Sequence, residues 1–213
     1  LILLCENQTG YQNLVKLVSL ASLEGFYQKP RVDWELLSQY HEGLICLSGC
    51  LAGEIPRLLS ENDYASAKQT ALRYQALFGR ENYFLEIQNH GIREELRNLP
   101  QLIRLSRETG IPLAATNDAH YLRKEDAAMQ EVLLCIQTGR TLDDPEHMHF
   151  ETEEFYLKST AEMAALFSDI PEAVTNTAQI AARCQVEFQP GKIWLPKFTM
   201  EGVSDCRKLF LQL

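Results

Sequence analysis

The sequence predicts an α/β fold in which short buried strands alternate with helices. Four short runs, at residues 1–5, 43–50, 83–90 and 112–118, are rich in apolar and small residues, as strands covered on both faces are. The stretches between them carry apolar residues at helical spacing. This alternation over residues 1–120 is typical of a parallel sheet with crossover helices. After His120 the pattern predicts helices only.

The helices are predicted from apolar spacing and from residues that typically cap or end a helix. Predicted helices cover residues 11–25, 33–40, 51–60, 63–78, 92–109, 125–138, a segment from 159 and 171–184. Pro100 is expected to kink or split the fifth of these helices. In the sixth we expect Val132, Leu133 and Ile136 to face inward. Ser159 and Glu162 have the spacing of a capping box.

Composition limits what the chain can do alone. The 213 residues include 20 Lys and Arg against 29 Asp and Glu, a net charge of −9. The chain therefore lacks the basic surface of an independent nucleic-acid-binding protein. No apolar run reaches the ~18 residues that a membrane-spanning helix requires, so we expect no membrane contact. Six cysteines without a CxxC pair favour reduced thiols and a cytoplasmic protein.

The most informative polar residues follow the fourth predicted strand. Asp118 and His120 are two residues apart and therefore point to the same side. Active sites of barrels and open sheets gather where parallel strands end. Oxygen and nitrogen ligands suit zinc, manganese or iron, so the pair predicts a metal site. The alternative is a helix-capping aspartate beside a surface histidine.

Two neighbouring strands add candidate residues. Cys50 follows the second predicted strand and is either a third metal ligand or a buried structural cysteine. Glu86, Gln88 and His90 share one face of the third, where polar side chains are costly unless they line a polar cavity or pair internally. We expect them to line the site or to orient its ligands. A catalytic metal usually takes three protein ligands and an open position, so this site looks incomplete.

Several collinear segments give the sequence a family likeness. It resembles the polymerase-and-histidinol-phosphatase (PHP) domain of bacterial DNA polymerase III alpha subunits through LILLCENQTGYQNLVKLVS, EGLICLSGCLAGEIP, NYFLEIQNHG and LAATNDAHYL. The same domain is similar to the later TLDDP, FYLKSTAEM, IPEAVTNTAQIAARC and IWLPKF. The resemblance therefore covers essentially the whole chain.

The resemblance implies a particular barrel and a ligand set. Domains of this family are distorted seven-stranded βα barrels with a metal cluster at the mouth. The chain would supply parallel strands 4 to 7 as a partial barrel, followed by a helical segment and a linker. Among the family's ligands, Cys50, Asp118 and His120 have counterparts here, and the N-terminal ligands have none. Residues 1–187 would be the C-terminal part of the PHP domain, and 188–213 a linker and first helix leading toward the polymerase palm.

The resemblance also implies a function for the longer protein of which this chain would be a fragment, here called the parent protein. That protein would be a DNA-directed DNA polymerase, a nucleotidyltransferase that uses DNA, deoxynucleotides and magnesium. Its PHP region would bind a divalent metal (zinc, manganese or iron) and act as a phosphoesterase or 3′–5′ exonuclease. Alternatively, that region would dock the proofreading exonuclease subunit or other holoenzyme subunits.

Two further expectations concern the chain itself. We expect it to be inactive alone and to expose the apolar edge of its first strand, LILLC, which would favour a homodimer. The alternative to a polymerase fragment is a free-standing PHP phosphoesterase such as a histidinol phosphatase.

Overall fold

The computed structural model describes residues 1–188, 190, 191, 193, 195 and 210. Its strands are β1 (Ile2–Cys5), β2 (Leu44–Leu47), β3 (Tyr83–Ile87) and β4 (Leu113–Ala115). Its helices are α1 (Gln8–Leu23), α2 (Trp34–Gln39), α3 (Glu54–Ser60), α4 (Tyr64–Phe78), α5 (Arg93–Thr109), α6 (Ala127–Thr138), α7 (Thr160–Leu166) and α8 (Pro171–Arg183). The mixed α/β class is therefore confirmed. The predicted linker and first helix, 188–213, lie almost wholly outside the described residues.

The four strands form one sheet in the order β1-β2-β3-β4. β3 runs parallel to both β2 and β4, as predicted. β1 runs antiparallel to β2, with Cys5 opposite Leu44, so the prediction of four parallel strands was wrong at β1. Along the chain, α1 and α2 connect β1 to β2. The chain enters β2 at the end of the sheet where β1 finished, and there the N–H of Glu6 donates to the carbonyl of Gly43 over 2.9 Å. The seven-stranded barrel stays a prediction.

β1 forms an open edge of this sheet. In the described part of the chain it pairs with β2 alone. Ile2 is 46% exposed, and Leu3 and Leu4 are half-buried. Both faces of this strand are only partly covered: Leu3 packs against the larger core cluster and Leu4 against the smaller one, while Ile2 is exposed.

The first turn of α1 is fixed against the entrance to β2. The Asn7 side chain caps α1 by accepting the N–H of Gly10 over 3.1 Å. A Cβ on Gly10 would meet the carbonyl oxygen of Gly43 at 1.8 Å, so only glycine fits this close approach. α1 thus holds together the two ends of the connection between β1 and β2.

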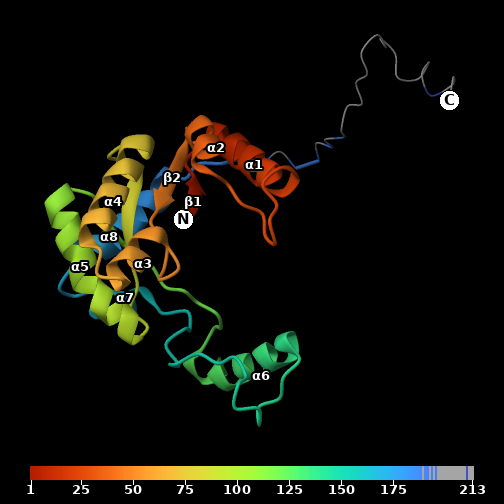
Figure 1. Ribbon diagram of the computed structural model, residues 1–213, viewed down its shortest axis with the longest axis vertical. Helices are drawn as coiled ribbons and strands as arrows, with labels where there is room; N and C mark the ends of the chain where they lie inside the picture. The colour runs from red at the N-terminus through yellow and green to blue at the C-terminus, as the bar shows by residue number, and fades with distance from the viewer. Residues whose placement is uncertain (189, 192, 194, 196–209, 211–213) are drawn as a thin grey trace.

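The sheet buries an apolar layer on each face. The larger layer packs against α3, α4 and α5 and includes Cys46, Tyr83, Leu85, Ile55, Ala71 and Leu105. The smaller layer packs against α8 and includes Ile45, Leu47, Phe84, Ala114 and Ile180. Burial raises the pKa of the Cys46 thiol to about 12, so this cysteine is a protonated core residue. Figure 1 shows α4 and α5 side by side in the body of the molecule and α6 standing apart from them.

Most helix ends follow their sequence signals. Asp33 caps α2 and Asp63 caps α4, each by accepting a backbone N–H in the first turn. Ser159 and Glu162 form the predicted capping box at the start of α7. Pro171 begins α8, where its missing N–H costs no helical hydrogen bond.

Pro100 does not split α5, which runs unbroken from Arg93 to Thr109. The inward face predicted for α6 was wrong at Leu133 and Ile136. In α6, Leu133 and Ile136 are 57% and 72% exposed, whereas Leu134 and Cys135 are buried. The physical reason is that α6 lies away from the sheet (Figure 1), so its broader apolar side does not meet the core.

Within the described residues, no helix is long and apolar enough to cross a bilayer.

Candidate metal-binding site

Glu86 connects the ends of three neighbouring strands. Its side chain leaves β3 and is only 5% exposed. One carboxylate oxygen accepts the N–H of Gly49, just after β2, over 3.1 Å. The other accepts the hydroxyl of Thr116, just after β4, over 2.5 Å and the amide of Gln88 over 3.1 Å. These donors compensate a buried charge that would otherwise be costly.

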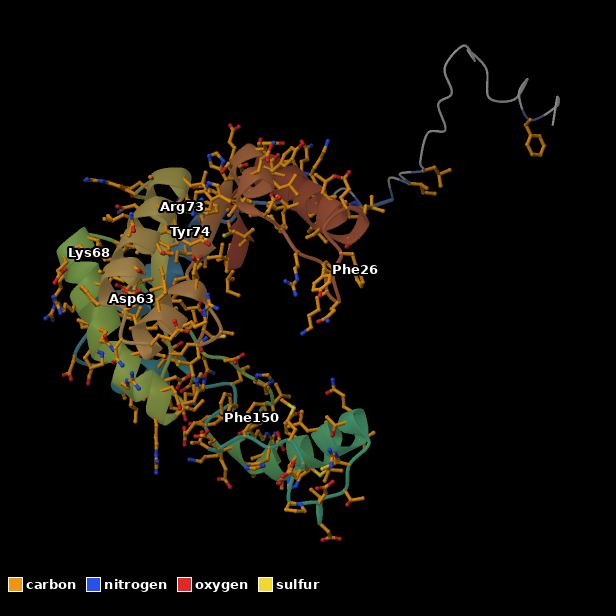
Figure 2. The ribbon with its side chains drawn as sticks, viewed as in Figure 1. Phe26, Asp63, Lys68, Arg73, Tyr74 and Phe150 are labelled. Atoms are coloured by element: carbon orange, nitrogen blue, oxygen red, sulfur yellow. The ribbon has the colours of Figure 1, made fainter. Side chains whose placement is uncertain are left out.

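Asp118 and His120 lie together on the loop that follows β4. Asp118 Oδ1 is 3.3 Å from His120 Nε2, and the two side chains are 46% and 38% exposed. The His120 ring packs against Phe150 and Phe155, with centroid distances of 4.8 and 5.7 Å. Figure 2 places Phe150 where the segment carrying α6 approaches the body of the molecule. The aromatic contacts hold the imidazole, and the carboxylate and ring nitrogen face solvent as a pair.

His90 lies buried behind this pair. Its ring is 1% exposed and stacks on Phe155 with a centroid distance of 4.4 Å. His90 Nδ1 is 2.9 Å from Glu95 Oε1, and the backbone N–H of Asp118 donates to His90 Nε2 over 3.2 Å. A side chain from the end of β3 thus supports the backbone of a candidate ligand.

Cys50 is placed differently. It is exposed, on the loop after β2, and it lines a small cavity together with Glu86, Gln88 and Asn98. In the part of the chain that the structure describes, no three His, Cys, Asp or Glu side chains are grouped so that they could hold a metal ion. The structure therefore brings Asp118 and His120 together but does not gather Cys50 with them.

The Asp118–His120 donor pair has the spacing of two ligands of one metal ion. Tetrahedral zinc with ligand bonds of about 2.0–2.2 Å holds neighbouring donor atoms about 3.3–3.6 Å apart. The 3.3 Å between Asp118 Oδ1 and His120 Nε2 matches that spacing, and both side chains are partly exposed. The pair fits two corners of such a site. A catalytic metal takes at least one more protein ligand.

Sequence reasoning missed Glu95 and Asn98 of α5. They are 7% and 1% exposed, and both line the cavity beside Cys50. Asn98 donates its amide to the carbonyl of Pro56, and its own Oδ1 has no partner among the described residues. A signal was available, because Glu95, Asn98 and the buried Leu102 share one helical face.

His147 is half-buried and paired rather than free on the surface. Its Nε2 lies 2.6 Å from Glu131 of α6, and its Nδ1 lies 2.6 Å from the carbonyl oxygen of Asp144. The Asp144 carbonyl, followed by the Glu131 carboxylate, raises the pKa of His147, because both favour the protonated ring. The neighbouring His149 is exposed. His147 therefore anchors the loop after α6.

The first part of the chain is similar to a known domain family. Residues 1–90 match the family described as the PHP domain. The matched residues include β1, β2 and β3.

The relatives of the whole chain are more specific. The chain is 53% identical to DNA polymerase III subunit alpha of Treponema pallidum, over 100% of this chain and 18% of that protein. It is 47% identical to the Borreliella burgdorferi protein of the same name, over 96% of this chain and 19% of that protein. For the Thermus aquaticus protein of that name the identity is 43%, over 98% of this chain and 18% of that protein. The predicted resemblance is therefore confirmed, and the chain spans less than a fifth of the length of these relatives.

Proposed function

We propose that this chain is part of the PHP domain of a replicative DNA polymerase III alpha subunit. The support is sequence identity of 43–53% to such subunits over nearly the whole chain. The parent protein would then be a cytoplasmic enzyme that adds deoxynucleotides to DNA with magnesium, and its polymerase residues would lie outside this sequence. The relatives named above are polymerase subunits, so they do not favour a free-standing phosphoesterase. Residues 1–187 would belong to the PHP domain.

The proposed role of this region is to supply part of a divalent metal site. Asp118 and His120 would be ligands, and Cys50 a further one once the loop after β2 approaches them. Zinc, manganese or iron would suit this donor set. The observation that carries the proposal is the spacing of the Asp118 and His120 donor atoms, 3.3 Å apart and open to solvent.

The supporting residues would act by orienting these ligands. Glu86 accepts from Gly49 on one side and from Thr116 on the other, so a single carboxylate sets the relative positions of the two loops that carry candidate ligands. Gln88 extends this network by donating to both Glu86 and Thr116. Residues that orient metal ligands in this way commonly change metal affinity 10- to 100-fold when replaced.

The activity that such a site would support is hydrolysis of a phosphoester, including 3′–5′ removal of nucleotides. The bound metal would supply a water of lowered pKa and would polarise the phosphoryl oxygens. The residues of this chain would hold the site open to solvent and fix the imidazole of His120 against Phe150 and Phe155. A metal cluster needs about three protein ligands for each metal, so two or three ligands are too few for it and the chain alone would be inactive.

Metal analysis of the complete parent protein tests this proposal. Wild-type protein should retain metal after extensive dialysis, and Asp118→Ala should retain less per mole of protein. Asp143→Ala is a matched control, since Asp143 is an exposed aspartate outside the candidate site. Equal metal content in the wild type and Asp118→Ala would reject Asp118 as a ligand.

A second candidate function is docking of another holoenzyme subunit, such as the proofreading exonuclease. The observation that favours it is the apolar face of α6, where Met129, Leu133 and Ile136 are 64%, 57% and 72% exposed. Leu133→Lys in the complete parent protein should weaken capture of that subunit, and Gln137→Lys on the same helix serves as the control. Equal capture by both variants would rule out docking on this face, and a dimer through β1 would have to be sought separately by sedimentation.

A further inference from the structure

We propose that Glu95 and His90 form a positioning pair that fixes the Asp118 backbone and so places the Asp118–His120 donors. This inference rests on the proposed metal site and extends it to a carboxylate on α5. Glu95 contacts neither donor of the pair, so its effect would be transmitted through the imidazole of His90.

The hydrogen bonds define the tautomer of His90. The backbone N–H of Asp118 can only donate, so His90 Nε2, 3.2 Å away, must present its lone pair. The proton of a neutral imidazole then sits on Nδ1, where Glu95 Oε1 accepts it over 2.9 Å. Glu95 therefore selects the form of His90 that can accept from Asp118.

The surroundings leave the imidazole little freedom to turn away. The ring is 1% exposed and lies parallel to Phe155, with an interplanar angle of 1°. Glu95 Oε2 also accepts the backbone N–H of His90 over 2.6 Å, so one carboxylate holds both the backbone and the ring. The carbonyl of His90 accepts the Thr152 hydroxyl over 2.6 Å. His90, at the end of β3, is therefore held by contacts from α5 and from the segment that contains Thr152 and Phe155.

A glutamine at position 95 should reverse the tautomer. Its single carbonyl oxygen has to accept the backbone N–H of His90, because that amide cannot change its role. The glutamine NH2 group then donates to His90 Nδ1, which moves the ring proton to Nε2. Nε2–H would oppose the N–H of Asp118, and two donors facing each other cannot bond. Glu95→Gln is nearly isosteric, so it changes hydrogen-bond polarity with little change of volume.

A second pair of variants isolates the acceptor at position 90. His90→Gln can place a carbonyl oxygen near the position of Nε2, whereas His90→Phe keeps an aromatic ring against Phe155 and offers no acceptor. Both replacements remove the ring N–H that Glu95 accepts, so the difference between them reports on the bond to Asp118. Glu94→Gln, an exposed neighbour of Glu95 on α5, controls for the loss of a charge.

The test uses the complete parent protein and two readouts. The first is hydrogen–deuterium exchange of the peptide that contains Asp118, measured without added metal. Loss of one hydrogen bond should speed exchange of that amide about fivefold in His90→Phe and Glu95→Gln, but not in His90→Gln or Glu94→Gln. The second is zinc affinity by chelator competition, which should fall about tenfold or more in the same two variants.

The outcomes separate this inference from the proposed metal function. Equal exchange of the Asp118 amide in His90→Phe and His90→Gln, with wild-type exchange in Glu95→Gln, overturns the positioning pair even if the wild type binds zinc. The expected exchange differences in a protein that binds no zinc support the positioning pair and reject the metal site. If His90→Phe fails to fold, the comparison of Glu95→Gln with Glu94→Gln decides the question alone.

Discussion

Replacing Glu86 by alanine should destabilise the domain. Glu86→Ala removes the acceptor for Gly49, Thr116 and Gln88 at once. The N–H of Gly49 is buried in this contact, and leaving such a donor unpaired costs about 1–3 kcal/mol. Thr116 and Gln88 are only partly buried and regain bonds to water, so each adds at most about 0.5 kcal/mol. The expected loss in the free energy of unfolding is therefore about 1–4 kcal/mol.

Chemical denaturation of the complete PHP domain measures this loss. The shift in midpoint multiplied by an unchanged slope gives the change in the free energy of unfolding. Glu94→Ala is the control, because it removes an exposed carboxylate from the start of α5. If Glu86→Ala unfolds at the same denaturant concentration as Glu94→Ala, the network at the strand ends does not stabilise the fold. The reasoning from buried hydrogen bonds would then be refuted.

Three other predictions test separate parts of the fold. Gly10→Ala should lower the denaturation midpoint strongly, because its Cβ would meet the Gly43 carbonyl at 1.8 Å; an unchanged midpoint would contradict this packing. Tyr83→Phe should leave stability equal or higher, since the buried Tyr83 hydroxyl has no partner in the described residues; a clear loss by the same assay would indicate a missed bond. Glu162→Gln should make the loss of stability in acid smaller than in the wild type. Donation from Ser159 lowers the pKa of Glu162 to about 2 from 4.5. The contribution of Glu162 to stability is therefore complete above pH 4.5 and disappears as the pH falls toward 2. Unfolding midpoints that fall equally with pH in Glu162→Gln and the wild type would count against that capping box.

Sequence signals predicted the helices and strands better than they predicted the direction in which a strand runs in the sheet. Each predicted strand and helix up to residue 184 has a counterpart, because caps such as Asp63 act over three or four residues. The antiparallel run of β1 could not be predicted this way, because it depends on where two helices return the chain. The exposure of Leu133 had the same kind of cause: periodicity identifies an apolar face of α6 but not what lies against it.

The candidate site was predictable only in part, for a related reason. Alternation along β3 singled out Glu86 correctly as a polar residue that pairs internally. The strand ends at Ile87, so the same alternation has no physical basis at His90, which is buried by contacts with α5 and Phe155 instead. Glu95 is five residues further on and becomes a partner of His90 only because the chain turns into α5.

One strand organises both loops that carry candidate ligands. Glu86 and His90 both belong to β3 or its end, and they bond to the loop after β2 and to the segment around Asp118. Asp118 itself is 46% exposed and supports little of the core. Replacing Asp118 should therefore weaken metal binding with little loss of stability, whereas replacing Glu86 should weaken both. A metal-binding loss without any stability loss in Glu86→Ala would mean that this carboxylate acts on the metal directly rather than through the loops it holds.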